Sequence, residues 1–424
     1  MPSRHLERIT LHHNDDDDML SCIVHENQTH DQREEDMSGL LGSEGNVRTH
    51  AETEEQCPWR KDRLQTLALV GLLKQLWPCE KVTMGLCVSR WMRDELAGIV
   101  DTVLLAGTAS GRLEPASICK SVLRFLHNRV ILRWTGGNTG IKALTKGMLA
   151  AACSNGCVSL TTLDFRANRM GAEGSANLAL ILPHCSSLQH LNLSANAIGA
   201  SGAMCIADSI TYCQKLTHVD LSKNFVGSET GLYLLSNLAL CSSLRHINLS
   251  KNALVFRAGG MSRALGTCSR LQHLNLSLNG IGVPGAEKLA QVLPAITCLE
   301  HLDLDGNGFG PEGMQRLAEG LSQCSSLACL SLSSNQIGGA GAECLARVLS
   351  KRREEGGLPL ECLEAASNGL GDEGAACVAE ALRGRTGWVR VNLRLNEIGA
   401  EGVGKLQAAL DGSHSSLSFV DLVQ

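Results

Sequence analysis

Apolar residues recur in one fixed phrase from about residue 160 to the end of the chain. Each phrase places apolar residues eight, five and three positions before an asparagine, as with Leu188, Leu191 and Leu193 before Asn196. Their spacing predicts a short strand that buries one face. The asparagines that close the nine phrases are Asn168, Asn196, Asn224, Asn252, Asn279, Asn307, Asn335, Asn368 and Asn396. They lie 28 residues apart except for one interval of 27 and one of 33, which indicates an internal repeat.

A helix is predicted after each asparagine. Glycine stands three positions after it in eight of the nine repeats, where a turn needs a positive φ or a close approach. Apolar residues such as Ala286, Leu289, Ala290 and Leu293 then follow at helical spacing. Strands stack about 4.8 Å apart while helices need about 8–10 Å, so the array must curve with its strands inside. The sequence predicts an α/β solenoid, a horseshoe with a parallel sheet on the concave face and helices on the convex face.

The phrase, the period and the Ile-Gly-x-x-Gly helix start resemble the ribonuclease-inhibitor-like class of leucine-rich repeats. The resemblance covers residues from about 160 to 424 and implies a concave surface that binds a protein partner. Nucleotide-binding immune receptors and activators of the GTPase Ran are similar in this region. The chain lacks the phosphate-binding Gly-x-x-x-x-Gly-Lys-Ser/Thr loop of the first group and the acidic C-terminal tail of the second. Activation of a Ran-like GTPase is a minor alternative, and nothing singles out one arginine for it.

The chain before the repeats divides into two parts. Residues 1–58 hold 14 Asp/Glu against 4 Lys/Arg without periodicity, which predicts a disordered acidic tail. Residues 59–135 carry apolar positions at helical spacing and predict a small helical module. The repeat domain is expected over 136–424 and begins with a degenerate capping repeat. A tenth phrase begins at Leu417, either as a final cap or as the start of a further repeat.

The helical module also resembles an F-box, an aliphatic helix followed by an Arg-Trp segment. The residues in register with that motif are Leu64, Leu69, Leu72, Leu73, Leu76, Pro78, Cys87, Arg90 and Trp91. The match departs at Gln65, where the family has proline, and it has one extra residue before Trp91. The resemblance implies binding to a Skp1-type adaptor, with the repeats presenting a substrate for ubiquitin transfer. The alternative is a helical cap for the solenoid, built from the same residues.

Composition narrows the class of partner. Only 3% of residues are aromatic although 44% are hydrophobic, as in a solenoid with a narrow aliphatic core. The net charge of −5 comes from the acidic tail, so the rest of the chain has no strong basic field for nucleic acid. No apolar run approaches the roughly 18 residues that span a bilayer, so no membrane contact is predicted.

The cysteines indicate a reducing compartment. Six of them stand eleven positions before a repeat asparagine: Cys157, Cys185, Cys213, Cys241, Cys268 and Cys324. One cysteine per repeat, at one structural position, is typical of a small buried apolar residue rather than of half a disulfide. The cytoplasm, or the nucleus, is the expected location.

Two columns of polar residues are predicted on the concave face, because their positions alternate with the inward leucines. The first holds histidine in five consecutive repeats, six positions before the asparagine. The second, two positions later, is rich in Asp and Asn. The residues predicted to contact a partner are His190, His218, His246, His273, His301, Asp220, Asp303, Glu364, Arg390 and Arg394.

The histidine column admits three interpretations. A metal ladder or a pH-sensitive docking strip would use the imidazoles directly. Duplicated repeats that share one residue type explain the column more simply, so no metal or cofactor is predicted. The chain has no Gly-x-Ser-x-Gly, no His-Glu-x-x-His and no paired Cys-x-x-Cys clusters, so no enzyme is predicted. We therefore expect a scaffold that binds another protein, with the F-box adaptor as the main alternative.

Overall fold

The computed structural model describes residues 160–255, 265–350, 359–383 and 389–411 together with the backbone of three further strands. Those strands are β1 (Thr102–Gly107), β2 (Arg129–Trp134) and β12 (Phe419–Asp421). The chain divides into two compact units, Met1–Cys79 and Glu80–Gln424. Every described element belongs to the second unit.

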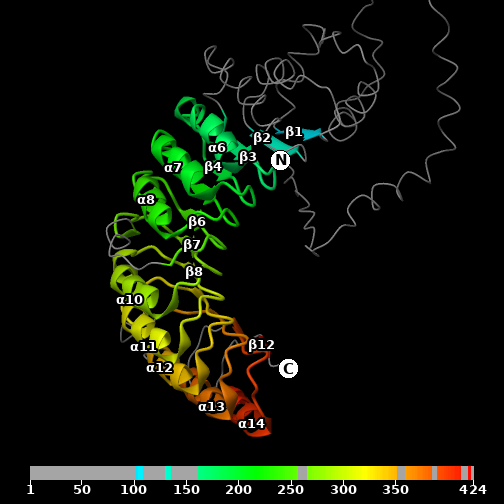
Figure 1. The fold of residues 1–424 in the computed structure, drawn as a ribbon. Coiled ribbons are helices and arrows are strands. Elements are labelled where there is room, and N and C mark those ends of the chain that lie inside the picture. Colours follow the sequence, from blue (N-terminus) through cyan, green and yellow to red (C-terminus); the bar gives the residue numbers. More distant parts are fainter. Residues whose placement is uncertain are drawn as a thin grey trace, which may run out of the picture. The chain divides into compact units, whose positions relative to one another are not determined.

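Within the described residues, twelve parallel strands form a single sheet in the order of the sequence (Figure 1). The repeat strands are β3 (Thr162–Asp164), β4 (His190–Asn192), β5 (His218–Asp220), β6 (His246–Asn248), β7 (His273–Asn275), β8 (His301–Asp303), β9 (Cys329–Ser331), β10 (Cys362–Glu364) and β11 (Arg390–Asn392). Each strand buries its middle residue and pairs with its neighbours so that equivalent positions lie side by side, as Leu191 lies beside Val219. The predicted strands are confirmed, and the tenth phrase forms β12, which pairs with β11.

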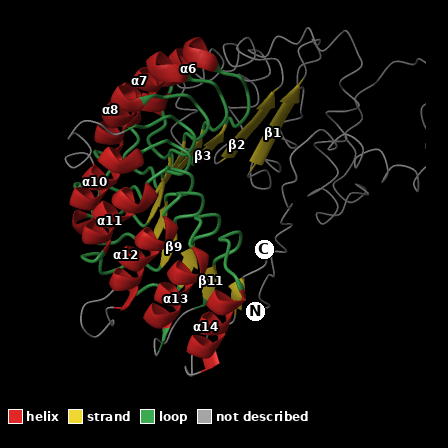
Figure 2. Ribbon diagram, turned by 60° about the horizontal axis from the view of Figure 1, so that its bottom comes forward, coloured by secondary structure: helices red, strands yellow, loops and turns green. Residues whose placement is uncertain are grey.

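Helices cover the outer side of this sheet, and the strands line the inner side of the curved repeat array (Figure 2). The α-helices are α6 (Gly171–Ala179), α7 (Gly199–Ile210), α8 (Ser228–Leu238), α10 (Gly282–Val292), α11 (Gly310–Leu321), α12 (Gly338–Ser350), α13 (Gly371–Leu382) and α14 (Ala400–Asp411). Short 3-10 helices η4 (Leu182–His184) and η5 (Leu293–Ala295) follow α6 and α10. None of the described helices is long and apolar enough to cross a membrane.

Two glycines at the helix start have different roles, and the first confirms the positive φ that the sequence predicts. Gly199, the first residue of α7, has a φ of +66°, which an L side chain rarely adopts. Gly202, one turn later, has a normal φ but faces the preceding helix. A Cβ there would lie 3.0 Å from the Cα of Ala172 and 2.7 Å from the side chain of Ile198. The first glycine therefore allows the turn, and the second allows successive helices to pack closely.

The cysteines of the repeated position are part of the core. Cys185, Cys213, Cys241, Cys268 and Cys324 are all buried, which confirms the predicted burial, while Cys157 lies outside the described residues. The Cys213 thiol donates to the carbonyl of Leu182 in the preceding repeat over 3.3 Å. Burial raises the pKa of the Cys213 thiol to about 12, so it stays protonated. These thiols serve as small apolar groups, and those of Cys213 and Cys241 also donate to a carbonyl at the end of the preceding repeat's helical segment.

A ladder of buried asparagines joins the repeats. The backbone N–H of each repeat asparagine donates to the side-chain Oδ1 of the asparagine in the next repeat, from Asn168 through to Asn396. In the middle of the ladder, the Asn224 Nδ2 donates to the carbonyls of Leu193, Leu221 and Ser222 at 2.8–3.1 Å. Its Oδ1 accepts the backbone N–H of Asn196, so one side chain satisfies polar backbone groups of its own turn and of the preceding turn.

The ladder holds a backbone that most residues avoid. Both residues that flank each repeat asparagine have a positive φ, and most of them are not glycine. Around Asn224 these are Lys223 at +58° and Phe225 at +55°. A non-glycine residue in this region costs about 1–2 kcal/mol. The hydrogen bonds of the buried carboxamide offset that cost. The asparagine therefore recurs in every repeat, whereas the residues that flank it are mostly not glycine.

The structure differs from the sequence prediction in part of the range 59–135. Thr102–Gly107 and Arg129–Trp134 are not helical but form β1 and β2, which extend the parallel sheet from β3. Both segments contain runs of Val, Leu and Ile, and the unpaired edge of β3 supplies the partner that favours a strand. The F-box-like segment and the acidic tail 1–58 lie outside the described residues and stay predictions.

We expect Asn224→Ala to destabilise the repeats by about 3 kcal/mol or more, because it leaves several buried backbone groups without partners at about 1–3 kcal/mol each. Asn237→Ala is the matched control. Asn237 lies on α8, where its Nδ2 donates to the carbonyl of Tyr233 at the protein surface, and its loss should cost at most about 0.5 kcal/mol. Urea denaturation of the full chain measures both changes. Equal shifts of the unfolding midpoint would contradict a special role for the ladder.

Candidate functional site

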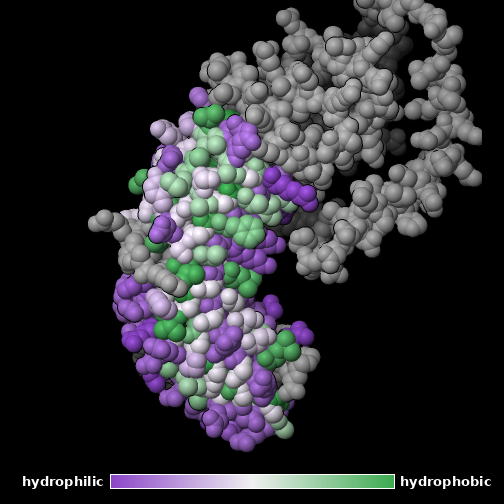
Figure 3. Space-filling model, in the orientation of Figure 1, coloured by the Kyte–Doolittle hydropathy of each residue, from purple (hydrophilic) through white to green (hydrophobic). Residues whose placement is uncertain are grey.

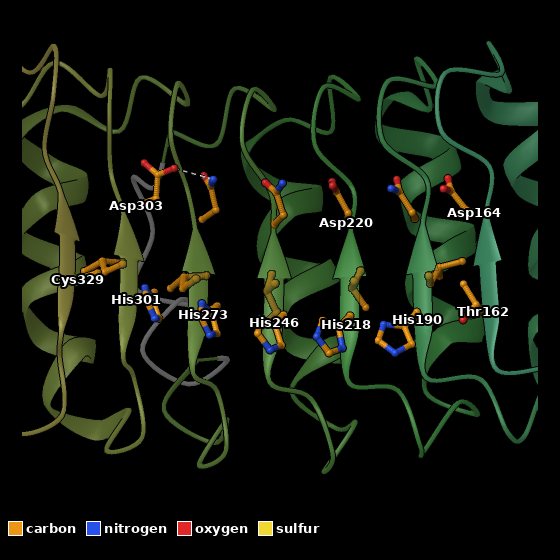
Figure 4. Close-up of a pocket in the computed structure, with 18 of the residues that line it drawn as sticks. Thr162, Asp164, His190, His218, Asp220, His246, His273, His301, Asp303 and Cys329 are labelled. Carbon is orange, nitrogen blue, oxygen red and sulfur yellow. Dashed lines mark hydrogen bonds between the residues drawn. The ribbon is translucent and has the colours of Figure 1, made fainter. Parts of the chain in front are cut away.

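The inner face of the sheet carries a groove of about 760 Å³ that runs from β3 to β9 (Figure 4). In each strand the first and third residues lie on either side of a buried middle residue and face the groove. The first residues form the histidine column, which runs from Thr162 through His190, His218, His246, His273 and His301 to Cys329. The third residues form the acid and amide column. Both predicted columns therefore lie on one surface.

The five imidazoles are stacked ring on ring. Ring centroids of successive histidines lie 4.2, 3.9, 4.1 and 4.1 Å apart from His190 to His301. Interplanar angles are 28° for the first pair and 9–16° for the others. This spacing is shorter than the roughly 4.8 Å between strands, so the rings lean together into contact. The column forms a continuous strip of flat, half-buried rings.

The rings in the middle of the strip resist protonation. Burial, followed by the neighbouring His190, His273 and Arg245, lowers the pKa of His218 to about 4. His246 behaves in the same way, and burial followed by His301 lowers the pKa of His273. A charged ring would lose hydration and would repel the next ring. These three histidines are consequently neutral at physiological pH and can donate and accept hydrogen bonds.

The second column has a structural task that the sequence interpretation missed. The Asp220 Oδ1 accepts the backbone N–H of Ser222 over 2.9 Å, and other members of the column accept the N–H two residues further on. Across strands, the Asn275 Nδ2 donates to the Asp303 Oδ2 over 2.7 Å. Asp or Asn before a serine two positions later is a signal for such a turn, and it is present in the repeats. The side chains of this column thus fix the strand ends, and fewer of their oxygen atoms remain to accept hydrogen bonds from a partner.

Charge is distributed unevenly along the inner face. Arg245, Lys223 and Lys251 lie beside β5 and β6 near the middle of the groove, and Asp164 and Asp220 line its N-terminal half. The C-terminal side carries carboxylates at Glu300, Asp303, Asp305, Glu361 and Glu364. Burial, followed by the charge of Asp303, raises the pKa of Asp305 to about 6. Carboxylates therefore occur along the whole groove and are most numerous at and beyond its C-terminal end.

Most of the residues predicted to contact a partner lie together in the groove. All five histidines line the groove, together with Asp220 and Asp303. Glu364 and Arg390 lie further along the sheet and form an ion pair of 3.0 Å, and Arg394 lies in the turn after β11. The sequence interpretation overlooked the position before each histidine, which places Arg245 and Glu300 beside the strip. A charged residue directly before a column histidine was the available signal.

Comparison with known protein families identifies the repeat. The family model described as Leucine Rich repeat matches residues 184–207, 267–290, 295–318, 323–346 and 389–406. These segments are leucine-rich repeats. They contain five of the nine repeat asparagines, and the remaining phrases stack in the same register and extend the leucine-rich repeat array.

Solved structures that resemble the chain include two proteins with distant sequences. The leucine-rich repeat-containing protein LegL7 from Legionella pneumophila is 19% identical, with 74% of this chain and 89% of that chain covered and a TM-score of 0.46. The tropomodulin C-terminal domain of Caenorhabditis elegans is 12% identical, with 42% and 92% covered and a TM-score of 0.30. No curated protein matches the chain. Neither likeness carries an inference about a partner.

The depressed pKa of His218 predicts a pH-dependent stability. Its pKa is about 4 in the folded chain and near 6.5 in the unfolded chain, so the unfolded chain binds more protons between these values. The contribution of His218 is complete above about pH 6.5 and is lost as the pH falls towards about 4. Asp305 acts in the opposite direction because its pKa is raised. Wild type and His218→Gln both contain Asp305, so its contribution cancels when their free energies of unfolding are compared.

Urea denaturation at a series of pH values between about 4 and 7 measures the difference. The wild type should lose stability relative to His218→Gln as the pH falls. His184→Gln, which removes an exposed histidine outside the strip, controls for the loss of an imidazole. A difference between wild type and His218→Gln that stays constant with pH would refute the prediction.

Proposed function

We propose that this protein is a non-enzymatic scaffold that binds another protein in the groove on the inner face of its leucine-rich repeats. The observation that carries the proposal is the continuous strip of five stacked imidazoles across that groove. The asparagine ladder and the turns of the second column hold this surface in place before a partner arrives. A preordered surface loses little conformational entropy on binding.

The chemistry of the strip suits a protein partner. Neutral imidazoles can be covered without the desolvation penalty of a charge, and each offers hydrogen-bonding nitrogens beside a flat ring. The basic residues beside β5 and β6 and the carboxylates near the C-terminal end of the groove would orient a partner that carries the opposite arrangement of charges. The ribonuclease-inhibitor-like type of repeat is part of the proposal and is supported by the period of 28 residues. Action in the cytoplasm or the nucleus also stays a proposal.

The outer face is the competing surface. Large hydrophobic side chains are exposed on the helices of the first repeats and directly after them, among them Met204 on α7, Tyr212 after α7 and Leu240 after α8, at 50–62% of their full exposure. In Figure 3 such hydrophobic surface is interspersed with hydrophilic surface. Scattered apolar side chains of this kind are normal on a folded protein. The inner groove is therefore the better candidate, and the outer residues supply a matched control.

The test begins with proximity labelling in cells, followed by purification of a labelled candidate and measurement of its affinity. Replacing His218, His246 and His273 together by alanine should raise the Kd about tenfold or more, equivalent to about 1.4 kcal/mol for each factor of ten. The melting temperature should change little because the rings are only half-buried. The loss then reports on the contact surface rather than on folding.

The control variant replaces Met204, Tyr212 and Leu240 by alanine on the outer face and should leave the affinity unchanged. Weaker binding by this variant, with normal binding by the histidine variant, would place the partner on the helices instead. Unchanged affinity in both variants would refute the role of the strip.

The F-box adaptor remains the alternative function, supported by the sequence of residues 64–91. If it holds, a Skp1-type adaptor should co-purify with the full chain, and removal of residues 60–100 should abolish co-purification without affecting the repeats. Substitution of the histidine strip should leave this interaction intact. Absence of the adaptor from purified full chain would favour the plain scaffold.

A further inference from the structure

We infer that His273, Glu300 and His301 bind a divalent cation of the Zn²⁺ class at the C-terminal end of the histidine strip. One donor atom from each residue lies within 4.8 Å of the other two. Two imidazoles and one carboxylate form a ligand set that zinc accepts while a fourth coordination position stays open. This inference goes beyond the proposed function and does not depend on it.

The strip as a whole does not explain the site, because a carboxylate directly precedes a histidine at only one end of the strip. The residues that directly precede the five histidines are Gln189, Thr217, Arg245, Gln272 and Glu300. Arg245 lies close enough to His218 and His246 to lower their pKa values, and it would repel a cation there. Glu300 instead adds an anionic ligand next to His301 and the adjacent ring of His273. Duplication therefore explains the column, and Glu300 makes one part of it chemically different.

The backbone and one outer contact hold the three ligands together. The N–H groups of Glu300 and His301 both donate to the carbonyl of Gln272, each over 2.9 Å. The Gln272 side chain donates from Nε2 to the Glu300 Oε1 over 3.1 Å. Such a contact to a metal-binding carboxylate orients it, as outer contacts of known metal sites do. Gln272 is thus a positioning residue for the cation.

The rings must turn slightly to coordinate one ion. His273 and His301 are stacked with their centroids 4.1 Å apart and their planes 9° from parallel, so their lone pairs run side by side. Rotation about χ2 of histidine is soft, and both rings are half-buried at the groove surface. The nearby carboxylates of Asp303 and Asp305 raise the local concentration of cations. The open coordination position would face the groove.

The experiment titrates Zn²⁺ into the full chain against a chromophoric chelator and counts the ions bound. Cysteines and other histidines of the chain also bind Zn²⁺, so the signal is the difference in bound ions between wild type and variants. Glu300→Gln, and separately His273→Ala with His301→Ala, should each remove one bound ion. Gln272→Ala should keep the ion but weaken its affinity by about 10- to 100-fold.

Two further variants test whether a carboxylate directly before a histidine determines where the ion binds. His190→Ala with His218→Ala removes a stacked pair that no carboxylate directly precedes, and it should leave the number of ions unchanged. Thr217→Glu places a carboxylate before His218 in the way that Glu300 precedes His301. It should add one bound ion. Co²⁺ in place of Zn²⁺ separates ligand types, because thiolate ligands give an intense near-ultraviolet band that imidazole and carboxylate do not.

Equal numbers of ions in wild type and Glu300→Gln would overturn the inference. An equal loss in the His190 and His218 variant would also overturn it, since binding would then belong to the whole strip. Thermal unfolding with a chelator present checks that each variant is folded. The gain expected from Thr217→Glu keeps the test decisive if a ligand variant fails to fold.

Discussion

The hydrogen bonds of the buried asparagine in each repeat are the interaction on which the turn, the strand register and the inner surface depend. Every repeat turns sharply after its strand, and the residues on both sides of the asparagine take a left-handed backbone that costs about 1–2 kcal/mol each when they are not glycine. The turn also buries carbonyl and amide groups that water cannot reach. A carboxamide both donates and accepts, so one side chain satisfies groups in two successive turns. Aspartate or leucine could not do both.

This ladder sets the register, and the register creates the inner surface. Because equivalent residues lie directly side by side, any residue type that duplication repeats becomes a column. Five histidines become a stacked strip in which burial and mutual repulsion keep the central rings neutral. The same register brings Glu300 to the adjacent pair of rings. A surface suited to a protein partner and a proposed cation site therefore follow from one geometric constraint.

Much of this organisation could be predicted from spacing alone. The strand leucines, the turn glycines, the buried cysteines and the concave placement of the histidines all follow from counting residues back or forward from the asparagines. The strands at Thr102–Gly107 and Arg129–Trp134 could not be predicted in this way, because they lack the phrase and depend on the free edge of β3. The turn contacts of Asp220 and its equivalents were missed because a column of acids and amides resembles an exposed binding surface.

The sequence by itself determined the repeat, its secondary structure and the face on which each residue lies, because strand and helix periodicity are local properties. Only the tertiary structure decided how neighbouring repeats interact. The 3.9–4.2 Å contact between rings, the depressed pKa of His218 and the approach of Glu300 to His273 depend on stacking between residues that lie 27 or 28 positions apart. Spacing along a chain fixes which residues are neighbours, but the distances and the desolvation that give them their chemistry arise only when the repeats pack.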